Sequence, residues 1–462
     1  VALERRACLT PQTESMLAAS HAHSCFLSSS LRSRSVARGA VNNLLEGRRR
    51  ARLGTPAPFS SASLHQSRTD TTTHAHRGLR TARRRFGRCG FRKSFAATAG
   101  QVIGIEEHYD GKGKVVLVTG ANSGIGLEAS RQLASAGCTV LVAARTVDKA
   151  ARATAEVQAV AMDGGSAEPM VLDLADLASI KAWASAYLAS GRTLDAIVCN
   201  AGVAPDREGS GAGGAMRDEG LAVQRTADGF EQTIGVNHLS HFALVLELMP
   251  ALLSTPHSRV VITSGEIHNP ESPDGKNGSP PTLGALAGLA SGAAFNMCDG
   301  GTFDGNKSYK DSKLCGILFM RELARRLGEV EGGVVANAFS PGFVPSSALF
   351  RNQSAPVRAL LKYAFNYPPL ATSVQTAGLF TMHMVLGHEP GRASGQYYCG
   401  APDFVKAGEA AGIGFLRGIF RPEFAAKQPS AEACDDQVAR RLWELSEDLV
   451  GVKFKVAEKL KV

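Results

Sequence analysis

The sequence predicts an α/β fold in which helices cover both faces of a doubly wound, mostly parallel sheet. Short β-branched runs alternate with helical stretches from residue 114 onward, which is the rhythm of strand–helix–strand units. A glycine-rich segment, TGANSGIG at 119–126, lies between the first such strand and the first helix. The 462 residues have room for one large domain with extra segments, or for two domains. We predict a single domain over 112–455.

The first hundred residues differ sharply in composition from the rest. They contain 17 arginines and one lysine against four acidic residues, and are rich in serine, alanine and threonine. The formal net charge of +9 therefore divides into +14 in this segment and −5 in the remaining 362 residues, so nucleic-acid binding by the folded part is not indicated. The composition is typical of an organellar transit peptide. We predict a disordered leader over 1–105, processed near 94–99; an arginine-rich disordered tail is the alternative.

Other compositional signals are negative. No run of 18 or more apolar residues is present, so we expect no transmembrane helix. The nine cysteines are scattered without a C-x-x-C pair or metal-like spacing, and we interpret them as reduced thiols, mostly in the core, with no metal. Cys199 is expected to be a core residue.

Hydrophobic patterning places the individual elements. The expected strands are 114–118, 139–143, 170–174, 194–199, 259–263 and 334–339, and the expected helices are 127–136, about 228–253, 309–328 and 438–450. Helical patterning dominates from 355 on. Two segments, 205–220 and 270–307, read as irregular. Because the second is long and ends directly at Tyr309, we interpret 270–307 as an inserted lid.

The glycine-rich segment has the strand–turn–helix context of a Rossmann-type dinucleotide site. Gly120 would permit the tight turn, Gly124 would let the backbone approach the pyrophosphate, and Gly126 would allow close packing of helix on strand. The phosphates would face the free N–H groups of the helix N-terminus. The residues expected to bind the cofactor here are Gly120, Asn122, Ser123, Gly124, Ile125 and Gly126.

The end of the second strand indicates which cofactor is used. An acidic residue near this point would bind the ribose 2′-hydroxyl of NAD, but the sequence has Arg145, with Lys149 one turn on. Both suit a 2′-phosphate, so NADPH is the predicted cofactor. Asp173, with Leu174 beside it, could contact the adenine.

Tyr309 and Lys313 are four residues apart and would share one face of a helix. A phenol has a pKa of about 10 in water, and a neighbouring ammonium favours its ionised form. The pair is therefore a plausible acid for reduction chemistry. By itself this spacing is weak and occurs mostly on helix surfaces; the upstream nucleotide motif raises its significance.

Taken together, TGANSGIG, NAG at 200–202, Asn237, YKDSK at 309–313 and Pro341-Gly342 resemble the short-chain dehydrogenase/reductase family over residues 112–345. The resemblance implies that Tyr309 is the proton donor and that Lys313 lowers its pKa and holds the nicotinamide ribose. Asn237 would position a water linked to that lysine. The further cofactor contacts that it implies are Asn200, Ala201, Gly202, Lys313, Pro341 and Gly342.

Three other stretches, LGALAGL at 283–289, DGGTFDGNKSYKDSKLC at 299–315 and LWELSEDLVG at 442–451, are similar to the light-dependent protochlorophyllide oxidoreductases. That resemblance implies that NADPH gives a hydride, and a tyrosine a proton, across a ring double bond of a pigment that itself absorbs the light. It also implies a chloroplast location reached by a transit peptide.

Three positions depart from these families. A serine is usual where this chain has Gly265, with Ser264 one residue early; a cysteine is usual at Phe343; and a tyrosine is often found where Val203-Ala204 stands. Ser264 is kept as a catalytic candidate because a strand end can bend. The departures leave two alternatives open: a dehydrogenase acting on a carbonyl or alcohol such as a retinol-type substrate, and a non-catalytic NADPH- or pigment-binding protein.

The expected partner is a small-molecule substrate, and no nucleic acid. A lipophilic pigment and the leucines of 283–289 leave peripheral association with the thylakoid membrane open, and self-association into a homo-oligomer is open as well.

Overall fold

The computed structural model describes residues 102, 104–106, 108–205, 222–328, 333–345, 371–400 and 423–455. The chain divides into two compact units, Val1–Ala82 and Arg83–Val462, and every described residue lies in the second. The predicted leader over 1–105 therefore falls almost entirely outside the described residues, as do residues 206–220 of the predicted irregular segment 205–220.

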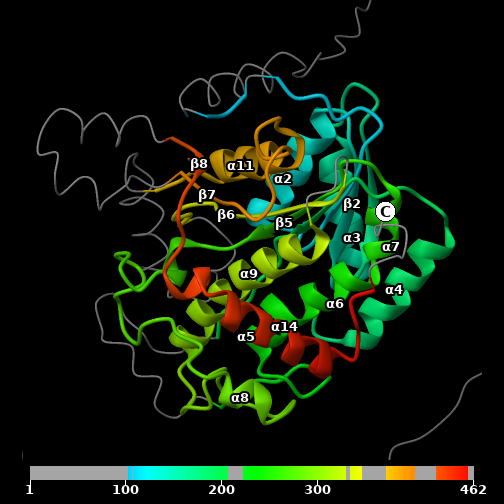
Figure 1. The fold of residues 1–462 in the computed structure, drawn as a ribbon. Coiled ribbons are helices and arrows are strands. Elements are labelled where there is room, and N and C mark those ends of the chain that lie inside the picture. Colours follow the sequence, from blue (N-terminus) through cyan, green and yellow to red (C-terminus); the bar gives the residue numbers. More distant parts are fainter. Residues whose placement is uncertain are drawn as a thin grey trace, which may run out of the picture. The chain divides into compact units, whose positions relative to one another are not determined.

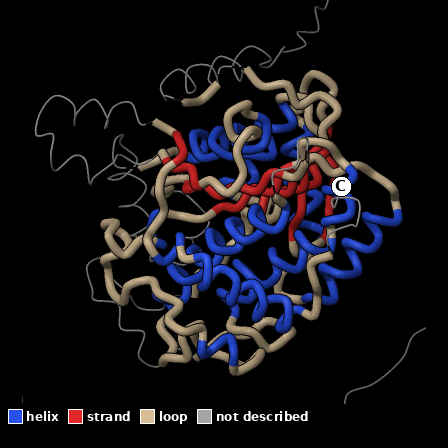
Figure 2. Tube along the Cα trace, in the orientation of Figure 1, coloured by secondary structure: helices blue, strands red, loops and turns tan. Residues whose placement is uncertain are grey.

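One eight-stranded sheet organises the described part of the chain, in the order β3-β2-β1-β4-β5-β6-β7-β8. Neighbouring strands are parallel except β7 and β8, which pair antiparallel. The strands are β1 (Val115–Val118), β2 (Thr139–Ala144), β3 (Ser166–Val171), β4 (Ala196–Cys199), β5 (Arg259–Thr263), β6 (Val335–Ser340), β7 (Tyr397–Cys399) and β8 (Ala425–Ala426). The order reverses between β1 and β4, where open α/β sheets bind ligands. Figure 2 shows the sheet between layers of helix.

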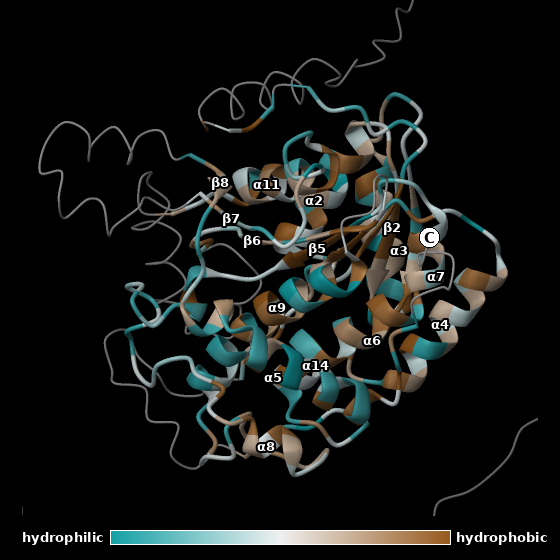
Figure 3. Cartoon of the chain, viewed as in Figure 1, coloured by the Kyte–Doolittle hydropathy of each residue, from teal (hydrophilic) through white to brown (hydrophobic). Residues whose placement is uncertain are grey.

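Alternating side chains of the strands feed two hydrophobic cores, as the pleat requires. In β1 and β2, Leu117 and Leu141 belong to one core, whereas Val116 and Val140 belong to the other. All four are fully buried. Figure 3 accordingly shows hydrophobic colour concentrated along the strands, which explains why short continuous apolar runs marked them in the sequence.

Helices cover both faces. Helices α2 and α11 lie on one side of the sheet, and α6, α9 and α14 on the other (Figure 1). The helices are α2 (Gly124–Ser135), α3 (Val147–Gln158), α4 (Leu177–Ala189), α5 (Gln232–Ile234), α6 (Ser240–Glu247), α7 (Met249–Ser254), α8 (Ala287–Ala290), α9 (Gly305–Leu327), α11 (Val374–Leu386) and α14 (Asp436–Val450). A π-helix, η1 (Gly235–Leu239), and 3-10 turns η2 (Glu266–His268) and η4 (Glu432–Cys434) complete them. The doubly wound parallel fold is therefore confirmed.

Two expectations about elements need correction. The single helix expected over about 228–253 is four consecutive pieces, α5, η1, α6 and α7; Pro250 lies in the first turn of α7, and the π-helix widens the turn before α6. The strand expected at 170–174 is β3, which begins and ends earlier, at Ser166 and Val171.

Helices dominate the described residues after 355, as expected, with α11 and α14, but strands β7 and β8 are present as well. These strands have only three and two residues, too few to show an alternating pattern.

The insertion 270–307 also differs from its sequence impression. Its leucines looked exposed, but Leu283, Leu286 and Leu289 are at most 1% exposed and belong to the larger core. The segment is mostly irregular apart from α8 and the start of α9. No helix among the described residues is long and apolar enough to cross a membrane.

Candidate active site

The glycine-rich turn joins β1 to α2 at the carboxyl edge of the sheet. Gly120 has a φ of +64°, and a Cβ there would lie 2.9 Å from the Cα of Ala201. A Cβ on Gly126 would lie 2.5 Å from Asn200 Nδ2. Any larger residue would force these segments apart. The close approach of helix, turn and neighbouring strand is the arrangement that a dinucleotide-binding turn needs.

The start of α2 offers donors to a phosphate. Ser123 is the N-cap residue, and its side chain makes no capping hydrogen bond. The first N–H groups of a helix have no intrahelical partner, so they can bind phosphate oxygens, assisted by the helix dipole. Asn122, Ser123, Gly124 and Ile125 are only half-buried here. The residues present therefore fit a dinucleotide pyrophosphate.

Arg145 follows the end of β2 and Lys149 lies in the first turn of α3; both are exposed. Strand β2 is tied to the glycine turn by a hydrogen bond from Ala121 N–H to Ala143 O, 3.1 Å. The Thr146 hydroxyl accepts from the Lys149 N–H and caps α3. Arg145 therefore follows a strand that is bonded to the nucleotide turn; binding of an additional phosphate group by these two cations stays a prediction.

Asp173 and Leu174 follow β3. The Asp173 carboxylate accepts from the Ala175 N–H at 2.9 Å, and the Asp173 N–H donates to Ser179 Oγ at 3.2 Å. Leu174 is buried, and its carbonyl accepts from the Ser240 hydroxyl. These bonds fix the loop after β3; an adenine contact by Asp173 stays a prediction.

The ends of β1 and β4 are held together by Thr119 and Asn200. The Asn200 side-chain amide donates to Thr119 O at 2.9 Å. The Thr119 hydroxyl oxygen accepts from the N–H groups of Asn200, at 2.9 Å, and Ala201, at 3.0 Å. The Asn200 amide nitrogen is thus engaged in shaping the crevice at the switch point of the sheet.

Asn237 lies in the π-helix and links three segments. Its Oδ1 accepts from the Val203 N–H at 2.8 Å, and its Nδ2 donates to Val203 O at 2.9 Å and to Ser312 Oγ at 3.0 Å. The first two bonds hold the chain after Gly202, and the third reaches the helix that carries Tyr309. A π turn is a frequent feature of functional sites, because it displaces side chains from regular helical positions.

Tyr309 and Lys313 lie one turn apart on α9, as predicted. The Lys313 Nζ is 5.4 Å from the centroid of the Tyr309 ring and donates to Thr263 O at 3.1 Å. Burial lowers the pKa of Lys313 to about 8. A Cβ built on Gly202 would lie 3.5 Å from Asn237 Oδ1 and 3.8 Å from Lys313 Nζ. The structure therefore brings the lysine, the asparagine and the turn after β4 together.

Ser264 takes a different position from the one a polarising serine needs. It is 3% exposed, its hydroxyl donates to Lys313 O at 2.8 Å, and its N–H donates to Phe339 O at 2.8 Å. The next residue, Gly265, has extended backbone, and a Cβ there would meet only Ile267, at 3.7 Å. Successive side chains of an extended segment alternate in direction. Ser264 therefore braces the catalytic helix, and space remains open at Gly265.

Pro341 and Gly342 follow β6 at the same edge of the sheet. Gly342 has a φ of +77°, and a Cβ there would collide with Thr372 Oγ1. The Phe343 carbonyl accepts from the Thr372 N–H at 2.7 Å. The turn after β6 thus packs tightly on 371–373, at the end of the described segment 371–400.

One residue of the network was missed from the sequence. His241 is 3% exposed; its Nε2 lies 2.9 Å from Thr119 Oγ1 and its Nδ1 lies 3.1 Å from Asn237 O. Burial lowers its pKa to about 4, so the ring is neutral at pH 7. Because a carbonyl can only accept, Nδ1–H donates to Asn237 O. The Nε2 lone pair then faces Thr119 Oγ1, whose single hydrogen also lies toward Val198 O, at an oxygen–oxygen distance of 3.1 Å. The available signal was its spacing, one helical turn after Asn237.

Cys199 lies in β4, is 3% exposed, and burial raises the pKa of its thiol, as expected for a core residue. None of the six described cysteines forms a disulfide, and five of them are buried. Among the described residues, no group of three or more His, Cys, Asp or Glu side chains could hold a metal ion.

Comparison with known proteins agrees with a site built from a dinucleotide-binding turn and a Tyr–Lys pair. The family model described as short chain dehydrogenase matches residues 114–275. Protochlorophyllide reductase A, chloroplastic, of Oryza sativa subsp. japonica is 36% identical over 348 residues, covering 73% of this chain and 81% of that protein. The chloroplastic protochlorophyllide reductase of Chlamydomonas reinhardtii is 33% identical, covering 73% and 78%.

Among solved structures, an uncharacterized protein from Mycobacterium paratuberculosis superposes with a TM-score of 0.51 at 25% identity, covering 76% of this chain and 97% of the other. The nucleotide turn, the Tyr309–Lys313 pair and these relatives define an NAD(P)-dependent oxidoreductase. The chain belongs to the short-chain dehydrogenase/reductase family and lies close to the protochlorophyllide reductases within it.

Proposed function

We propose that this chain reduces protochlorophyllide to chlorophyllide with NADPH in a light-driven reaction of chlorophyll synthesis. The observation that carries the proposal is the position of Lys313, whose ammonium lies 5.4 Å from the Tyr309 ring and beside the turn after β4. The choice of protochlorophyllide as the substrate rests on relatives at 33–36% identity that are named protochlorophyllide reductase.

NADPH, when bound, would supply the hydride. The glycine turn and the start of α2 would bind its pyrophosphate, and Arg145 with Lys149 would bind its 2′-phosphate. The four-carbon reach of Lys313 and the loops held by Asn200 and Asn237 would orient its ribose. Asp173, Leu174, Pro341 and Gly342 are the remaining residues that we assign to this site.

Tyr309 would supply the proton. In its charged form, Lys313 favours the phenolate that remains once the proton has left, because opposite charges attract strongly in a buried site. Asn237 fixes the helix through Ser312 and so sets the direction of the Tyr309 ring. Ser264, bonded to the backbone of Lys313, would act as a support of the helix.

The position of Ser264 bears on the alternative of a carbonyl or alcohol substrate. Such chemistry needs a hydroxyl directed at the carbonyl oxygen, whereas the Ser264 hydroxyl is directed at a helix carbonyl and Gly265 has no side chain. The arrangement therefore favours reduction of a carbon–carbon double bond, which needs no such group.

The test is to mix purified protein, NADPH and protochlorophyllide, illuminate, and follow the absorption of chlorophyllide against a dark control and a Tyr309→Phe variant. Conversion that needs light and Tyr309 is the expected result. Consumption of NADPH in the dark with an aldehyde or ketone would replace this reading by the carbonyl one. Cofactor binding without reduction of either substrate class would indicate a non-catalytic binding protein.

We further propose that residues 1–105 direct the chain to the chloroplast, on the strength of their composition and of relatives described as chloroplastic. A fusion of these residues to a fluorescent protein should accumulate in plastids. Peripheral thylakoid association and a homo-oligomer stay hypotheses. Leu283, Leu286 and Leu289 are buried, so exposed leucines give no support to membrane association. Flotation with thylakoid vesicles tests membrane association, and light scattering tests the homo-oligomer.

A further inference from the structure

The insertion 270–307 joins two parts of the ligand-binding edge. It begins just after Gly265, beyond the carboxyl end of β5, and it ends in the first turn of α9, the helix of Tyr309. Its apolar side chains enter the same core as α9, since Leu283, Phe295 and Cys298 are at most 3% exposed. The insertion is therefore part of the folded core next to the proton donor.

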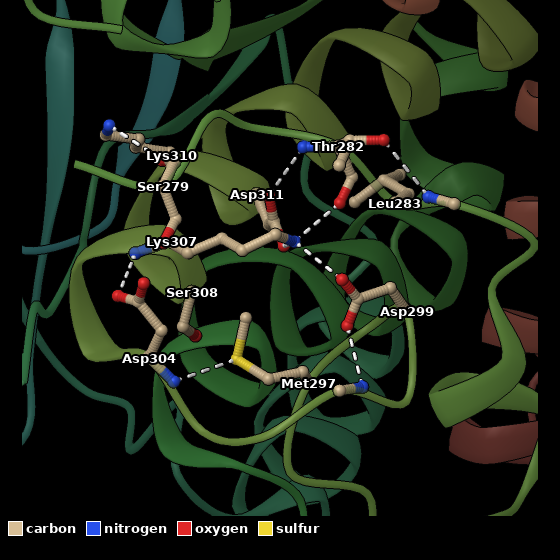
Figure 4. Close-up of polar contacts among 12 residues, drawn as sticks. Ser279, Thr282, Leu283, Met297, Asp299, Asp304, Lys307, Ser308, Lys310 and Asp311 are labelled. Atoms are coloured by element: carbon tan, nitrogen blue, oxygen red, sulfur yellow. Dashed lines mark hydrogen bonds and ion pairs between the residues drawn. The ribbon is translucent and has the colours of Figure 1, made fainter. Parts of the chain in front are cut away.

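Lys310, directly after Tyr309, is the first of its polar anchors. This lysine is fully buried, and its Nζ donates to three backbone carbonyls of the insertion, Gly275 O at 2.9 Å, Asn277 O at 2.5 Å and Ser279 O at 3.0 Å. An ammonium has three donors, and a buried charge is tolerated only when it is hydrogen-bonded. Figure 4 shows Lys310 beside Ser279.

Lys307 and Asp311 form the second anchor, one turn apart on α9. The Lys307 Nζ lies 2.6 Å from Asp311 Oδ2, 3.1 Å from Asp299 Oδ2 and 2.6 Å from Thr282 O. Asp311 in turn accepts from the Thr282 N–H at 3.1 Å. Figure 4 shows both stretches of the insertion, 279–283 and 297–304, converging on these side chains.

Burial raises the pKa of Asp311 to about 7, but both groups that face its carboxylate, Lys307 Nζ and the Thr282 N–H, are donors that favour its ionised form. Burial alone would lower the pKa of Lys307, but its attraction to Asp311 and Asp299 outweighs burial and raises that pKa. Asp311 has a fully buried side chain and uses both carboxylate oxygens as acceptors. Removing the Lys307 charge would leave the Asp311 carboxylate buried without an opposite charge, whereas removing the Asp311 charge would leave Lys307 paired to Asp299 alone.

Tyr309 thus lies between anchor residues at positions 307, 310 and 311 on the same helix. Neighbouring polar contacts add to the attachment. The Ser308 hydroxyl donates to Glu231 Oε2 at 2.8 Å, and the Leu283 N–H donates to Glu432 Oε1 at 2.7 Å. The path of the insertion relative to Tyr309 is therefore set by side chains of the catalytic helix itself.

We infer that Lys310 and the Lys307–Asp311 pair are positioning residues that determine acceptor specificity, because they hold the 270–307 insertion as a fixed wall beside Tyr309. This inference rests on the proposed function for the identity of the acceptor. A fixed wall excludes acceptors of the wrong shape without moving, whereas a lid would close over any bound molecule. The nucleotide turn lies on other elements, β1 and α2, and does not depend on the wall.

The test compares Lys310→Met with Lys276→Met. Lys276 lies in the same insertion, but its side chain is 61% exposed in an ion pair with Glu271. We expect Lys310→Met to raise the KM for protochlorophyllide about tenfold or more, with the Kd for NADPH changed less than about twofold. Lys276→Met should change neither. Equal weakening of both ligands, or no change in either, would overturn the inference.

Asp311→Asn is the second variant, should Lys310→Met fail to fold. It keeps the shape of the side chain and an acceptor for the Thr282 N–H, and removes only the charge facing Lys307. Asp311→Asn should also raise the KM for protochlorophyllide and leave the KM for NADPH unchanged.

A readout independent of turnover separates this inference from the proposed function. Amide hydrogen exchange should accelerate within 270–307 in Lys310→Met and stay unchanged in β1 and α2. If wild-type protein fails to reduce the pigment, the proposed function fails, and exchange still decides whether the wall is held by Lys310. Unchanged exchange in the insertion would refute the anchor.

Discussion

The nucleotide side and the acceptor side of the site are built by different means. On the nucleotide side, the groups that we propose to bind the ligand belong to the backbone: glycines at 120 and 126 allow close approach of neighbouring segments, and the first N–H groups of α2 have no capping side chain. On the acceptor side, buried charged side chains of α9 hold an irregular insertion in place. A backbone site can be recognised from glycine spacing, whereas a site built by long-range ion pairs cannot.

The largest effect on activity should come from Tyr309, which we place between the nucleotide side and the acceptor side. Tyr309→Phe removes one hydroxyl and should lower kcat by about 10²- to 10⁴-fold, the range for loss of a general acid. The Kd for NADPH should stay within about twofold. Stopped-flow absorption after a light flash measures the first quantity and fluorescence titration the second. Retention of full activity would eliminate Tyr309 as the proton donor.

Gly126→Ala tests the nucleotide side alone. Its methyl group would lie 2.5 Å from Asn200 Nδ2 and from Gly120 O, so we expect a loss of about 1–3 kcal/mol in the free energy of unfolding, as for overpacking, together with weaker NADPH binding. Urea denaturation and cofactor titration measure the two. If Gly126→Ala left both the free energy of unfolding and the Kd for NADPH unchanged, the turn would have space for a methyl group, and the close approach would not be required.

Arg145→Ala sharpens the assignment of the cofactor. A hydrogen bond to a charged group contributes about 1.5–3 kcal/mol, so the Kd for NADPH should rise by about 10- to 100-fold while that for NADH changes little. Calorimetric titration of wild-type protein and Arg145→Ala with each cofactor measures these Kd values. Equal effects on the two would mean that Arg145 does not meet a 2′-phosphate.

The pKa of Lys313, lowered by burial to about 8, sets a pH dependence. The charged form should support proton transfer, so kcat/KM, which reports groups of the free enzyme, should fall as pH rises through 8 and be about tenfold lower one unit higher. Folding stability should respond in the opposite sense. Between 8 and 10.5 the unfolded lysine binds more protons than the folded one, so this group's contribution to stability rises with pH. A flat activity profile up to pH 10 would contradict the assignment.

The smallest effect is expected for Gly265→Ser. Its backbone is extended, and a Cβ would meet only Ile267 at 3.7 Å, so the free energy of unfolding should change by less than about 0.5 kcal/mol. This variant also serves as the stability control for Gly126→Ala. Thermal unfolding checks it, and a large loss of stability would show that the space beyond β5 is not open.

Sequence reasoning succeeded where the signal was local. The apolar runs at 115–118 and 139–144 were found because both faces of each strand are buried, and the glycine turn was found because its spacing follows from backbone geometry. The Tyr309–Lys313 pair was found for the same reason, since four residues make one helical turn.

It failed where the structure depends on distant partners. Strands β7 and β8 are too short to carry a pattern; β7 is placed by its pairing with β6, and β8 by its pairing with β7. Nothing in the sequence marks the lysines at 307 and 310 as buried, because only the carbonyls and carboxylates that the fold brings to them make their burial tolerable. Ser264 is a catalytic candidate from the sequence because a strand end can bend; in the fold its hydroxyl donates to Lys313 O.

The π-helix at Gly235–Leu239 contains one residue more than an α-helical turn would need, and the positions of the site residues depend on that extra residue. Removing one residue there would allow an ordinary α-helix, with every backbone bond still made, but it would rotate α6 by about 100° relative to α5. Asn237 and His241 could then no longer serve Val203 and Thr119 together. A one-residue deletion should therefore preserve the fold and abolish the site, because the extra residue of the π-helix is needed for the positions of Asn237 and His241 and not for the helix itself.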